Sequence, residues 1–346
     1  MSDIRAGEEL DLAKIDPWLK TKLTDLRGTA KVTQYSGGAS NWTYRLEYEN
    51  HDLVLRRPPA GTKAKSAHDM SREFKVQQAL KPLFPAVPEM IAYCDESLLG
   101  VDFYVMRRID GLIPRKQLPK EVPSDPAFCR KLCESLIDKL VELHQVDAEK
   151  AGLSAMGKGP GYPKRQIDGW SERYQKARTW NVPRFTYVMD WLKANTPTDV
   201  RQCVIHGDYR FDNVVLDKQD PSKIIGVLDW EMATIGDPLM DLGNSLAYWV
   251  EGGDDFLAKS LRRQPTHLPG MFTRREVVER YCSKMGLKAD GFTFYEVYGN
   301  FRLAVIAQQI YYRYFHKQTR NPAFKRFWLF IHYLHYRCRR LIRQAR

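Results

Sequence analysis

Three polar side chains in the second half of the chain have the types and the spacing that phosphoryl transfer requires. Asp208 and Asn213 lie in a polar turn after the apolar residues 204–205, and Asp229 follows a second apolar run, residues 224–228. Transfer of a phosphoryl group needs a carboxylate that orients the attacking hydroxyl, oxygen ligands for Mg²⁺ and cations that face the phosphates. We therefore predict that Asp208 is the catalytic base and that Asn213 and Asp229 bind Mg²⁺.

The phrases around these residues resemble a known enzyme family. His206-Gly207-Asp208, followed by Asn213, has the spacing of a kinase catalytic loop. Asp229-Trp230-Glu231 is followed by Gly236-Asp237-Pro238 and Asp241-Leu242-Gly243. This order is similar to that of the aminoglycoside phosphotransferase family in its broad sense, which includes choline-kinase-like enzymes and the kinase-like domains found with acyl-CoA dehydrogenases. A single Asp or Asn is as often an ordinary turn residue, but the ordered set flanked by strands favours the kinase interpretation.

The resemblance implies an α+β, protein-kinase-like fold of two lobes. Residues 1–107 would form the nucleotide-binding lobe, an antiparallel sheet with a helix, and residues 108–346 a mainly helical lobe for catalysis and acceptor binding. It further implies ATP, with GTP as an alternative, as the phosphate donor, Mg²⁺ as the cofactor, and Arg210 beside the transferred phosphate. Apolar periodicity predicts helices at residues 66–80, 125–145, 166–193, 238–250, 274–285, 293–315 and from 323 to the end.

Short alternating runs near the N-terminus predict three strands, at residues 30–35, 42–48 and 52–57. The small residues between the first two strands predict a hairpin turn. In a kinase-like lobe this turn lies over the nucleotide phosphates and directs backbone N–H groups to them. The residues concerned are Ser36, Gly37, Gly38, Ser40 and Asn41. An ordinary turn is the alternative, because the motif is weak by itself.

Alternation in the third strand puts Val54 and Arg56 on one face. The resemblance implies that Val54 faces the adenine and Arg56 the phosphates. A kinase has lysine at this point, so Arg56 is a departure that replaces a point charge by a planar fork for phosphate oxygens. Glu73, on the interior side of the helix predicted at residues 66–80, is the expected partner of Arg56. The alternatives are a solvated edge charge for Arg56 and an exposed helical position for Glu73.

A further strand, at residues 103–106, leads to the segment where the resemblance places the hinge between the lobes. Backbone groups near Met106, Arg107 and Ile109 are therefore expected at the edge of the adenine. His144, near the end of the helix predicted from 125, is expected to be structural rather than catalytic.

The composition is that of an ordinary globular protein, with 43% hydrophobic and 28% charged residues. The N-terminus has no apolar segment, and the longest aromatic-aliphatic run, residues 327–336, is too short and too interrupted to span a bilayer. We therefore expect a cytoplasmic protein without a membrane partner, and its oligomeric state is open. The six cysteines are scattered, which favours reduced, structural thiols over a zinc site.

The formal net charge of +12 favours anionic ligands. A nucleic-acid-binding protein is not supported, because the basic residues are spread along the chain and no known nucleic-acid-binding motif is present. A pseudokinase that binds nucleotide without catalysis is a second alternative, against which the intact Asp208, Asn213 and Asp229 argue. The predicted partners are therefore a nucleotide and a small-molecule hydroxyl acceptor, with no nucleic acid.

The acceptor is expected to be anionic. Residues 157–178 carry six basic side chains against only Asp168 and Glu172, and local charge of this sign favours an anionic substrate over a polycationic aminoglycoside. Residues 55–59 and 229–238 look most like the kinase-like domains associated with acyl-CoA dehydrogenases, a branch in which arginine at the strand lysine position is familiar. The resemblance therefore implies a hydroxyl on a carboxylate or hydroxyacyl-CoA-type metabolite, with an aminoglycoside antibiotic as the alternative.

Overall fold

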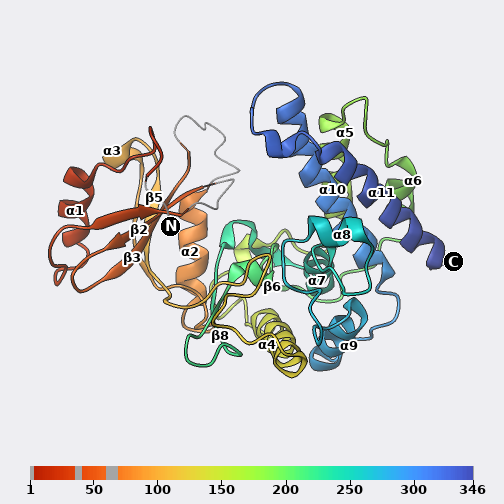
Figure 1. Cartoon of the computed structure of the whole chain (residues 1–346), viewed down its shortest axis with the longest axis horizontal. Coiled ribbons are helices and arrows are strands. Elements are labelled where there is room, and N and C mark those ends of the chain that lie inside the picture. Colours follow the sequence, from red (N-terminus) through yellow and green to blue (C-terminus); the bar gives the residue numbers. More distant parts are fainter. Residues whose placement is uncertain (1–3, 36–40, 60–68, 346) are drawn as a thin grey trace. The chain divides into compact units, whose positions relative to one another are not determined.

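The computed structural model describes residues 4–35, 41–59 and 69–345. They form two compact units, and Figure 1 labels their helices and several of their strands. Unit 1 consists of Met1–Leu112, Val214–Asp220 and Ile224–Ala233, and unit 2 of Ile113–Asn213, Pro221–Lys223 and Thr234–Arg346. The kinase-like α+β fold was predicted and is confirmed, with an antiparallel sheet in the N-terminal region and a mainly helical second unit.

Two segments that follow the catalytic loop in sequence belong to unit 1. Strands β7 (Val214–Leu216) and β8 (Ile224–Val227) pair antiparallel. Leu112 and Leu216 exchange two backbone hydrogen bonds, of 2.9 and 2.7 Å. The predicted lobe boundary after residue 107 did not anticipate these long-range pairings, and the roles assigned to the two lobes stay predictions.

Unit 1 is built on a five-stranded antiparallel sheet with the strand order β1-β2-β3-β5-β4. The four strands predicted in this part of the chain are confirmed, whereas β4 was not predicted. The strands are β1 (Lys31–Gln34), β2 (Trp42–Glu47), β3 (Asp52–Arg57), β4 (Met90–Cys94) and β5 (Phe103–Arg107). The helices of this unit are α1 (Leu12–Lys20), α2 (Met70–Leu80) and α3 (Glu96–Leu99).

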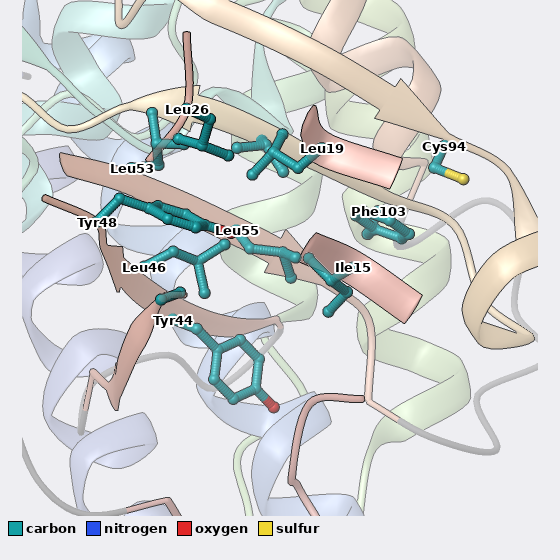
Figure 2. Close-up of a cluster of buried hydrophobic side chains, with 12 residues drawn as sticks. Ile15, Leu19, Leu26, Tyr44, Leu46, Tyr48, Leu53, Leu55, Cys94 and Phe103 are labelled. Carbon is teal, nitrogen blue, oxygen red and sulfur yellow. The ribbon is translucent and has the colours of Figure 1, made fainter. Parts of the chain in front are cut away.

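The alternation of β3 divides its side chains between two cores. Leu53 and Leu55 belong to a cluster that includes Ile15 of α1, shown in Figure 2. Val54 belongs to a second cluster, with Met70 of α2. The sheet is therefore covered by α1 on one face and by α2 on the other, and Arg56, two residues after Val54, shares the face of α2.

Unit 2 is mainly helical. The predicted helices 274–285 and 293–315 are confirmed residue for residue, while α8 was not predicted. Its helices are α4 (Pro126–His144), α5 (Tyr162–Ala177), α6 (Thr186–Ala194), α7 (Pro238–Ala247), α8 (Phe256–Leu261), α9 (Arg274–Met285), α10 (Thr293–Phe315) and α11 (Phe327–Gln344). A two-stranded ladder, β6 (Cys203–Ile205) with β9 (Thr234–Gly236), leads into the catalytic loop.

Two glycines set the distance between α7 and α10. A Cβ atom built at Gly299 would lie 2.0 Å from the carbonyl oxygen of Gly243, and one built at Gly243 would lie 2.4 Å from the oxygen of Tyr295. The two backbones are therefore in direct contact, which no other residue type allows. This contact holds α7, which carries Asp241 and is buried along its whole length, against α10.

All six cysteines are buried and free, as the prediction of reduced, structural thiols requires. Within the described ranges, no helix is both long enough and apolar enough to cross a membrane.

Candidate active site

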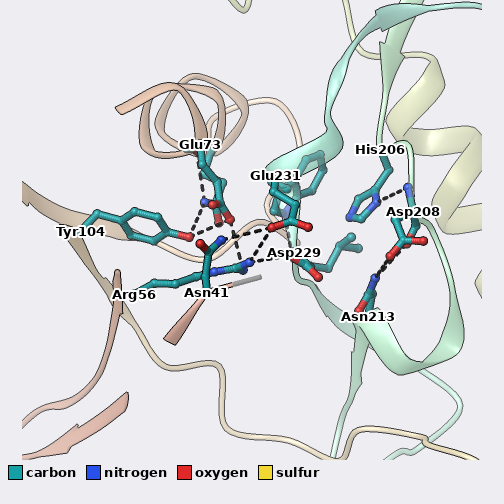
Figure 3. A network of polar contacts seen from close by, with 12 residues as sticks. Asn41, Arg56, Glu73, Tyr104, His206, Asp208, Asn213, Asp229 and Glu231 are labelled. Carbon is teal, nitrogen blue, oxygen red and sulfur yellow. Dashed lines mark hydrogen bonds and ion pairs between the residues drawn. The ribbon is translucent and has the colours of Figure 1, made fainter. Parts of the chain in front are cut away.

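An ion pair lies at the centre of the polar network in unit 1. Arg56 Nη1 is 3.2 Å from Glu73 Oε1, and the two side chains are 12% and 2% exposed. The hydroxyl of Tyr104 donates to the same carboxylate oxygen at 2.8 Å, as Figure 3 shows. The predicted Arg56–Glu73 pair is thus confirmed, and neither residue is the solvated surface charge of the alternative interpretation.

The buried position of this pair changes the acidity of both groups. Burial raises the pKa of the Glu73 carboxyl, and the charge of Arg56 offsets only part of that rise. Burial by itself would lower the pKa of Arg56, but the nearby charges of Glu73 and Asp229 raise it well above its ordinary value. Arg56 therefore remains a cation, as its predicted role in phosphate binding requires.

Asp229 occupies a strained backbone position beside Arg56. Its φ is 69° and its ψ is 63°, which is the left-handed region, and Asp adopts it only at an energetic cost. Its Oδ1 lies 2.6 Å from Arg56 Nη2. Such strain persists where the surrounding structure requires it, commonly at functional sites, and this supports a functional role for Asp229.

Glu231 belongs to the same network and was missed as a site residue. Its Oε2 lies 3.4 Å from Arg56 Nη2 and accepts a hydrogen bond of 3.1 Å from Asn41 Nδ2. The signal was present, because Glu231 stands two residues after Asp229 in the phrase quoted for the resemblance. Of the predicted hairpin residues, only Asn41 is described; Ser36, Gly37, Gly38 and Ser40 lie outside the described residues.

The structure places the predicted adenine-facing residues on the α2 side of the sheet and just after it. Val54 and Met106 pair across β3 and β5, and both are buried. The backbone N–H of Arg107 is already bonded to the carbonyl of Glu89 at 2.8 Å, so that amide is not free for a nucleotide. Among the described residues, the backbone N–H of Ile109 has no such partner, and it is the better candidate of the two.

In unit 2, a buried aspartate on α7 fixes the catalytic loop. Asp241 accepts hydrogen bonds from the backbone N–H groups of His206 (2.9 Å) and Gly207 (2.8 Å). Its Oδ2 also lies 3.2 Å from Nε2 of His144, which is fully buried at the end of α4. His144 therefore has the predicted structural role, while Asp241 was missed because its partners are far away in sequence.

The environment of Asp241 favours its charged form. Burial alone would raise the pKa of this carboxyl, but the hydrogen bond with His144, the charges of His144 and His206, and the bond from the His206 backbone together lower it. The carboxylate is thus held ionised inside the protein by groups that also fix the loop.

Asp208, the predicted base, is held between an amide and a guanidinium. Asn213 Nδ2 donates to the Asp208 carbonyl at 2.8 Å and lies 3.3 Å from its Oδ2 (Figure 3). Arg210 Nη2 is 3.1 Å from the same Oδ2, and the Asp208 side chain is 21% exposed. The loop therefore brings together three predicted residues, with the base still open to a ligand.

Arg210 is itself fixed by its surroundings. Its guanidinium lies 4.4 Å from the centre of the Tyr248 ring, and its Nε lies 3.3 Å from Asp212 Oδ1. Burial raises the pKa of Asp212, and the charge of Arg210 offsets part of that rise. The cation thus stands beside the base in a defined orientation.

Each unit separately contains oxygen atoms that suit a hard divalent cation. In unit 2, Asn213 directs its amide nitrogen at Asp208, which leaves its Oδ1 available as a ligand. In unit 1, Asp229 and Glu231 carry carboxylate oxygens. Within the described part of the chain, no group of three or more His, Cys, Asp or Glu side chains is gathered as a metal site. The ligand chemistry fits Mg²⁺, which is usually bound through one or two carboxylates together with phosphates and water.

A groove of about 950 Å³ lies elsewhere in unit 2. It is lined by the N-terminal part of α5, the end of α6 and residues 196–202. None of the predicted catalytic residues lines it, so its size alone does not identify an acceptor site.

Comparisons with known proteins agree with this geometry. A family model described as the phosphotransferase enzyme family matches residues 31–277, a range that holds every predicted site residue. Acyl-CoA dehydrogenase family member 11 of Rattus norvegicus is 35% identical over 323 residues, which are 90% of this chain and 41% of that protein. The chain therefore spans about two fifths of the length of this relative.

Solved structures share the fold. A Ralstonia eutropha protein, assigned provisionally to the aminoglycoside phosphotransferases, has a TM-score of 0.79 and 26% identity, covering 96% of this chain and 99% of that one. A thermostable aminoglycoside phosphotransferase mutant, solved with AMP-PNP and hygromycin B, has a TM-score of 0.58 and 15% identity, covering 95% and 98%. On the match of the family model, this chain belongs to the phosphotransferase enzyme family.

Proposed function

We propose that the protein transfers the γ-phosphoryl group of ATP, in the presence of Mg²⁺, to a hydroxyl of a small molecule. The observation that carries the proposal is the catalytic loop. It holds the Asp208 carboxylate 3.1 Å from Arg210 and against Asn213, and it is itself fixed by two backbone hydrogen bonds to buried Asp241. Membership of the family supports phosphotransferase chemistry, and the arrangement of Asp208 and Arg210 supports a mechanism for it.

Asp208 would orient the acceptor hydroxyl and take its proton as the oxygen attacks the γ-phosphorus. The new O–P bond forms as the bond to the β-phosphate oxygen breaks, and ADP leaves. Arg210 would face the negative charge of the transferred group, because its guanidinium is already fixed beside Asp208. A pseudokinase has no need for this arrangement of base and cation.

Arg56 is proposed to bind phosphate oxygens of the nucleotide. Its guanidinium is held by Glu73 from the α2 side and contacts the carboxylates of Asp229 and Glu231. A planar fork can bind two phosphate oxygens at once, so arginine can take the place of the usual lysine. Asn41 and the hairpin that it ends are proposed to cover the nucleotide, with Val54, Met106 and Ile109 near its base.

Mg²⁺ would neutralise phosphate charge and hold the phosphates in place, and Asn213 and Asp229 would each supply an oxygen ligand. Glu231 is a further oxygen donor next to Asp229. The protein's own contribution is to hold these oxygens in place, through the loop contacts of Asn213 and the constrained backbone of Asp229.

We propose an anionic acceptor such as a hydroxylated carboxylate or acyl-CoA compound. On α5, Lys164 is paired with Asp168 at 2.7 Å and Lys176 with Glu172 at 2.5 Å. Both acidic side chains of this segment are thus occupied, and its remaining basic residues leave a positive excess. The alternative is a cationic antibiotic, which is favoured by the hygromycin B bound to one protein of the same fold.

The test is ADP formation from ATP by the purified protein against a panel of hydroxylated compounds, with Mg²⁺ or with EDTA. The panel pairs hydroxy acids and hydroxyacyl-CoA thioesters with kanamycin-type aminoglycosides. We expect Mg²⁺-dependent turnover with an anionic member. Efficient phosphorylation of the aminoglycosides would overturn the proposed acceptor class, and the absence of any Mg²⁺-dependent nucleotide turnover would overturn the phosphotransferase proposal.

A further inference from the structure

Arg302, in the middle of α10, is a buried cation without a carboxylate partner. Its side chain is 4% exposed, and Nη2 donates a hydrogen bond of 2.8 Å to the carbonyl oxygen of Gly207, the residue before Asp208. Within the described part of the chain, this carbonyl is its only hydrogen-bond acceptor, and no Asp or Glu forms an ion pair with it. A buried charge of this kind is costly unless another charge compensates it.

Asp208, the carboxylate whose charge influences Arg302, already forms an ion pair with another arginine. The charge of Asp208 reaches Arg302, but its carboxylate contacts Arg210 at 3.1 Å. The phenol of Tyr248 lies near charges of both signs, that of Asp208 and those of Arg210, Arg302 and Arg263. Among the described residues, Arg302 thus has no carboxylate in direct contact, and an anionic ligand would supply one.

A second unpaired arginine extends this positive region outward. The guanidinium of Arg302 lies 5.2 Å from the centre of the Trp170 ring, and that of Arg173 lies 4.6 Å from the same ring. Trp170 is buried, whereas Arg173 is exposed, and neither arginine has an ion pair with a described residue. The indole therefore links one cation at the surface to another beside the catalytic loop.

We propose that Arg302, with Trp170 and Arg173, is the specificity site that binds a carboxylate or phosphate group of the acceptor. The inference deepens the proposed phosphotransferase function and rests on it for the identity of the ligand as the acceptor. Bound there, an anionic group supplies the counter-charge that Arg302 lacks. The acceptor hydroxyl would then be presented to Asp208, which directly follows the residue that Arg302 contacts.

The test is the binding of matched probes, measured by isothermal titration calorimetry on the full chain. The probes are 3-hydroxybutyrate against 1,3-butanediol, for a carboxylate source, and glycerol 3-phosphate against glycerol, for a phosphate source. We expect the wild type to prefer the anionic member of at least one pair. Arg302→Gln should weaken that binding by about 10- to 100-fold, because a hydrogen-bonded charge pair is lost. Binding of the neutral members should change little.

Two further variants keep the test independent of folding. Arg173→Gln changes an exposed residue, so it should keep the thermal unfolding temperature and weaken anion binding by less than Arg302→Gln does. Arg275 on α9 is 87% exposed and pairs with Glu279. Arg275→Gln removes the same charge far from the loop in sequence and should change neither the unfolding temperature nor anion binding. Arg302→Lys retains the charge and should bind the anions more tightly than Arg302→Gln.

The proposal is overturned if the wild type shows no preference for either anionic probe. It is also overturned if folded Arg302→Gln and Arg173→Gln bind the anions as tightly as the wild type. A purely structural Arg302 would lower stability and weaken anionic and neutral probes alike. Because binding is measured without ATP, failure of the phosphotransferase proposal would appear separately, as absent Mg²⁺-dependent ADP formation.

Discussion

Arg56 in unit 1 and Arg302 in unit 2 are both largely buried, and their charges are compensated in opposite ways. In unit 1, Arg56 contacts three carboxylates, those of Glu73, Asp229 and Glu231. In unit 2, the only hydrogen-bond acceptor of Arg302 among the described residues is the backbone carbonyl of Gly207. The charge of Arg56 is thus balanced by carboxylates of the protein, whereas the charge of Arg302 is not balanced by a carboxylate in direct contact. The difference suggests that Arg56 is built to exchange partners with a nucleotide, and Arg302 to gain one from a ligand.

The largest effects are expected when the charge of Arg56 or of Arg302 is removed. Arg56→Met leaves Glu73 buried without its cation, and breaking a buried pair from one side typically costs about 3–5 kcal/mol. Arg302→Met removes a charge that has no carboxylate partner, so the loss should be about 1 kcal/mol, roughly that of one hydrogen bond. Urea unfolding of the two variants measures both free energies.

Equal destabilisation by the two changes would contradict the comparison, because it would mean that Arg302 is compensated as fully as Arg56. Arg275→Met is the control, since this exposed arginine forms a surface pair with Glu279 and its removal should leave the unfolding curve unchanged.

A smaller loss is expected where α7 crosses α10. Gly299→Ala places a methyl group against the backbone of Gly243, and overpacking of this kind typically costs about 1–3 kcal/mol. Because α7 carries Asp241, activity should fall together with stability. Thermal unfolding and ADP formation are the measurements.

Gly253→Ala is the matched control, since nothing lies within 4 Å of a Cβ at that position. If Gly299→Ala were no less stable than Gly253→Ala, the close helix crossing would be wrong.

The smallest expected effects are in the pH dependence of stability, where two buried carboxyls should act with opposite signs. The pKa of Asp241 is lowered below its ordinary 3.8, so its contribution is present above pH 3.8 and is lost as the pH falls through the folded pKa. The pKa of Glu73 is raised above 4.5, so its contribution is lost as the pH rises above 4.5.

Unfolding free energies of Asp241→Asn and Glu73→Gln, measured between pH 3 and 7, test these signs. Relative to Asp241→Asn, the wild type should gain stability as the pH rises through the acidic end of this range. Relative to Glu73→Gln, it should lose stability as the pH rises above 4.5. Parallel curves for the wild type and either variant would refute the corresponding assignment.

Local patterns in the sequence were enough to predict four of the five strands of the sheet in unit 1 and most of the long helices, and together with the resemblance they predicted the pair Arg56–Glu73. Alternation along β3 determines which face of the sheet Arg56 occupies. Glu73 lies on the buried side of α2, which packs against that face. The D-x-x-x-x-N spacing likewise assigned Asp208 and Asn213 to one loop, in which the structure brings them into contact. In these cases the residues are close in sequence or one periodic pattern orients them.

The contacts that were missed depend on long-range packing. Asp241 binds backbone groups 34 and 35 residues away, and Arg302 reaches a carbonyl 95 residues away. The residue types give no sign of these buried contacts with the loop, because an Asp or Arg on a helix is usually exposed. β4 was not predicted although Pro85 and Pro88 stand before it, and the short α8 has too few residues to show a periodic pattern.

The central claim is that Asp229 is needed for Mg²⁺-dependent nucleotide binding, whereas Asp208 is needed for the transfer of the phosphoryl group to the acceptor. It is tested most directly by measuring ATP-dependent thermal stabilisation with Mg²⁺, and ADP formation with the best acceptor of the panel, in the wild type, Asp208→Asn and Asp229→Asn. Asparagine tolerates the left-handed backbone of position 229. Asp208→Asn should keep the Mg²⁺-dependent stabilisation and lose about 10²–10⁴ in turnover, whereas Asp229→Asn should lose the stabilisation itself. Near-normal turnover in Asp208→Asn, or undiminished stabilisation in Asp229→Asn, would contradict the account.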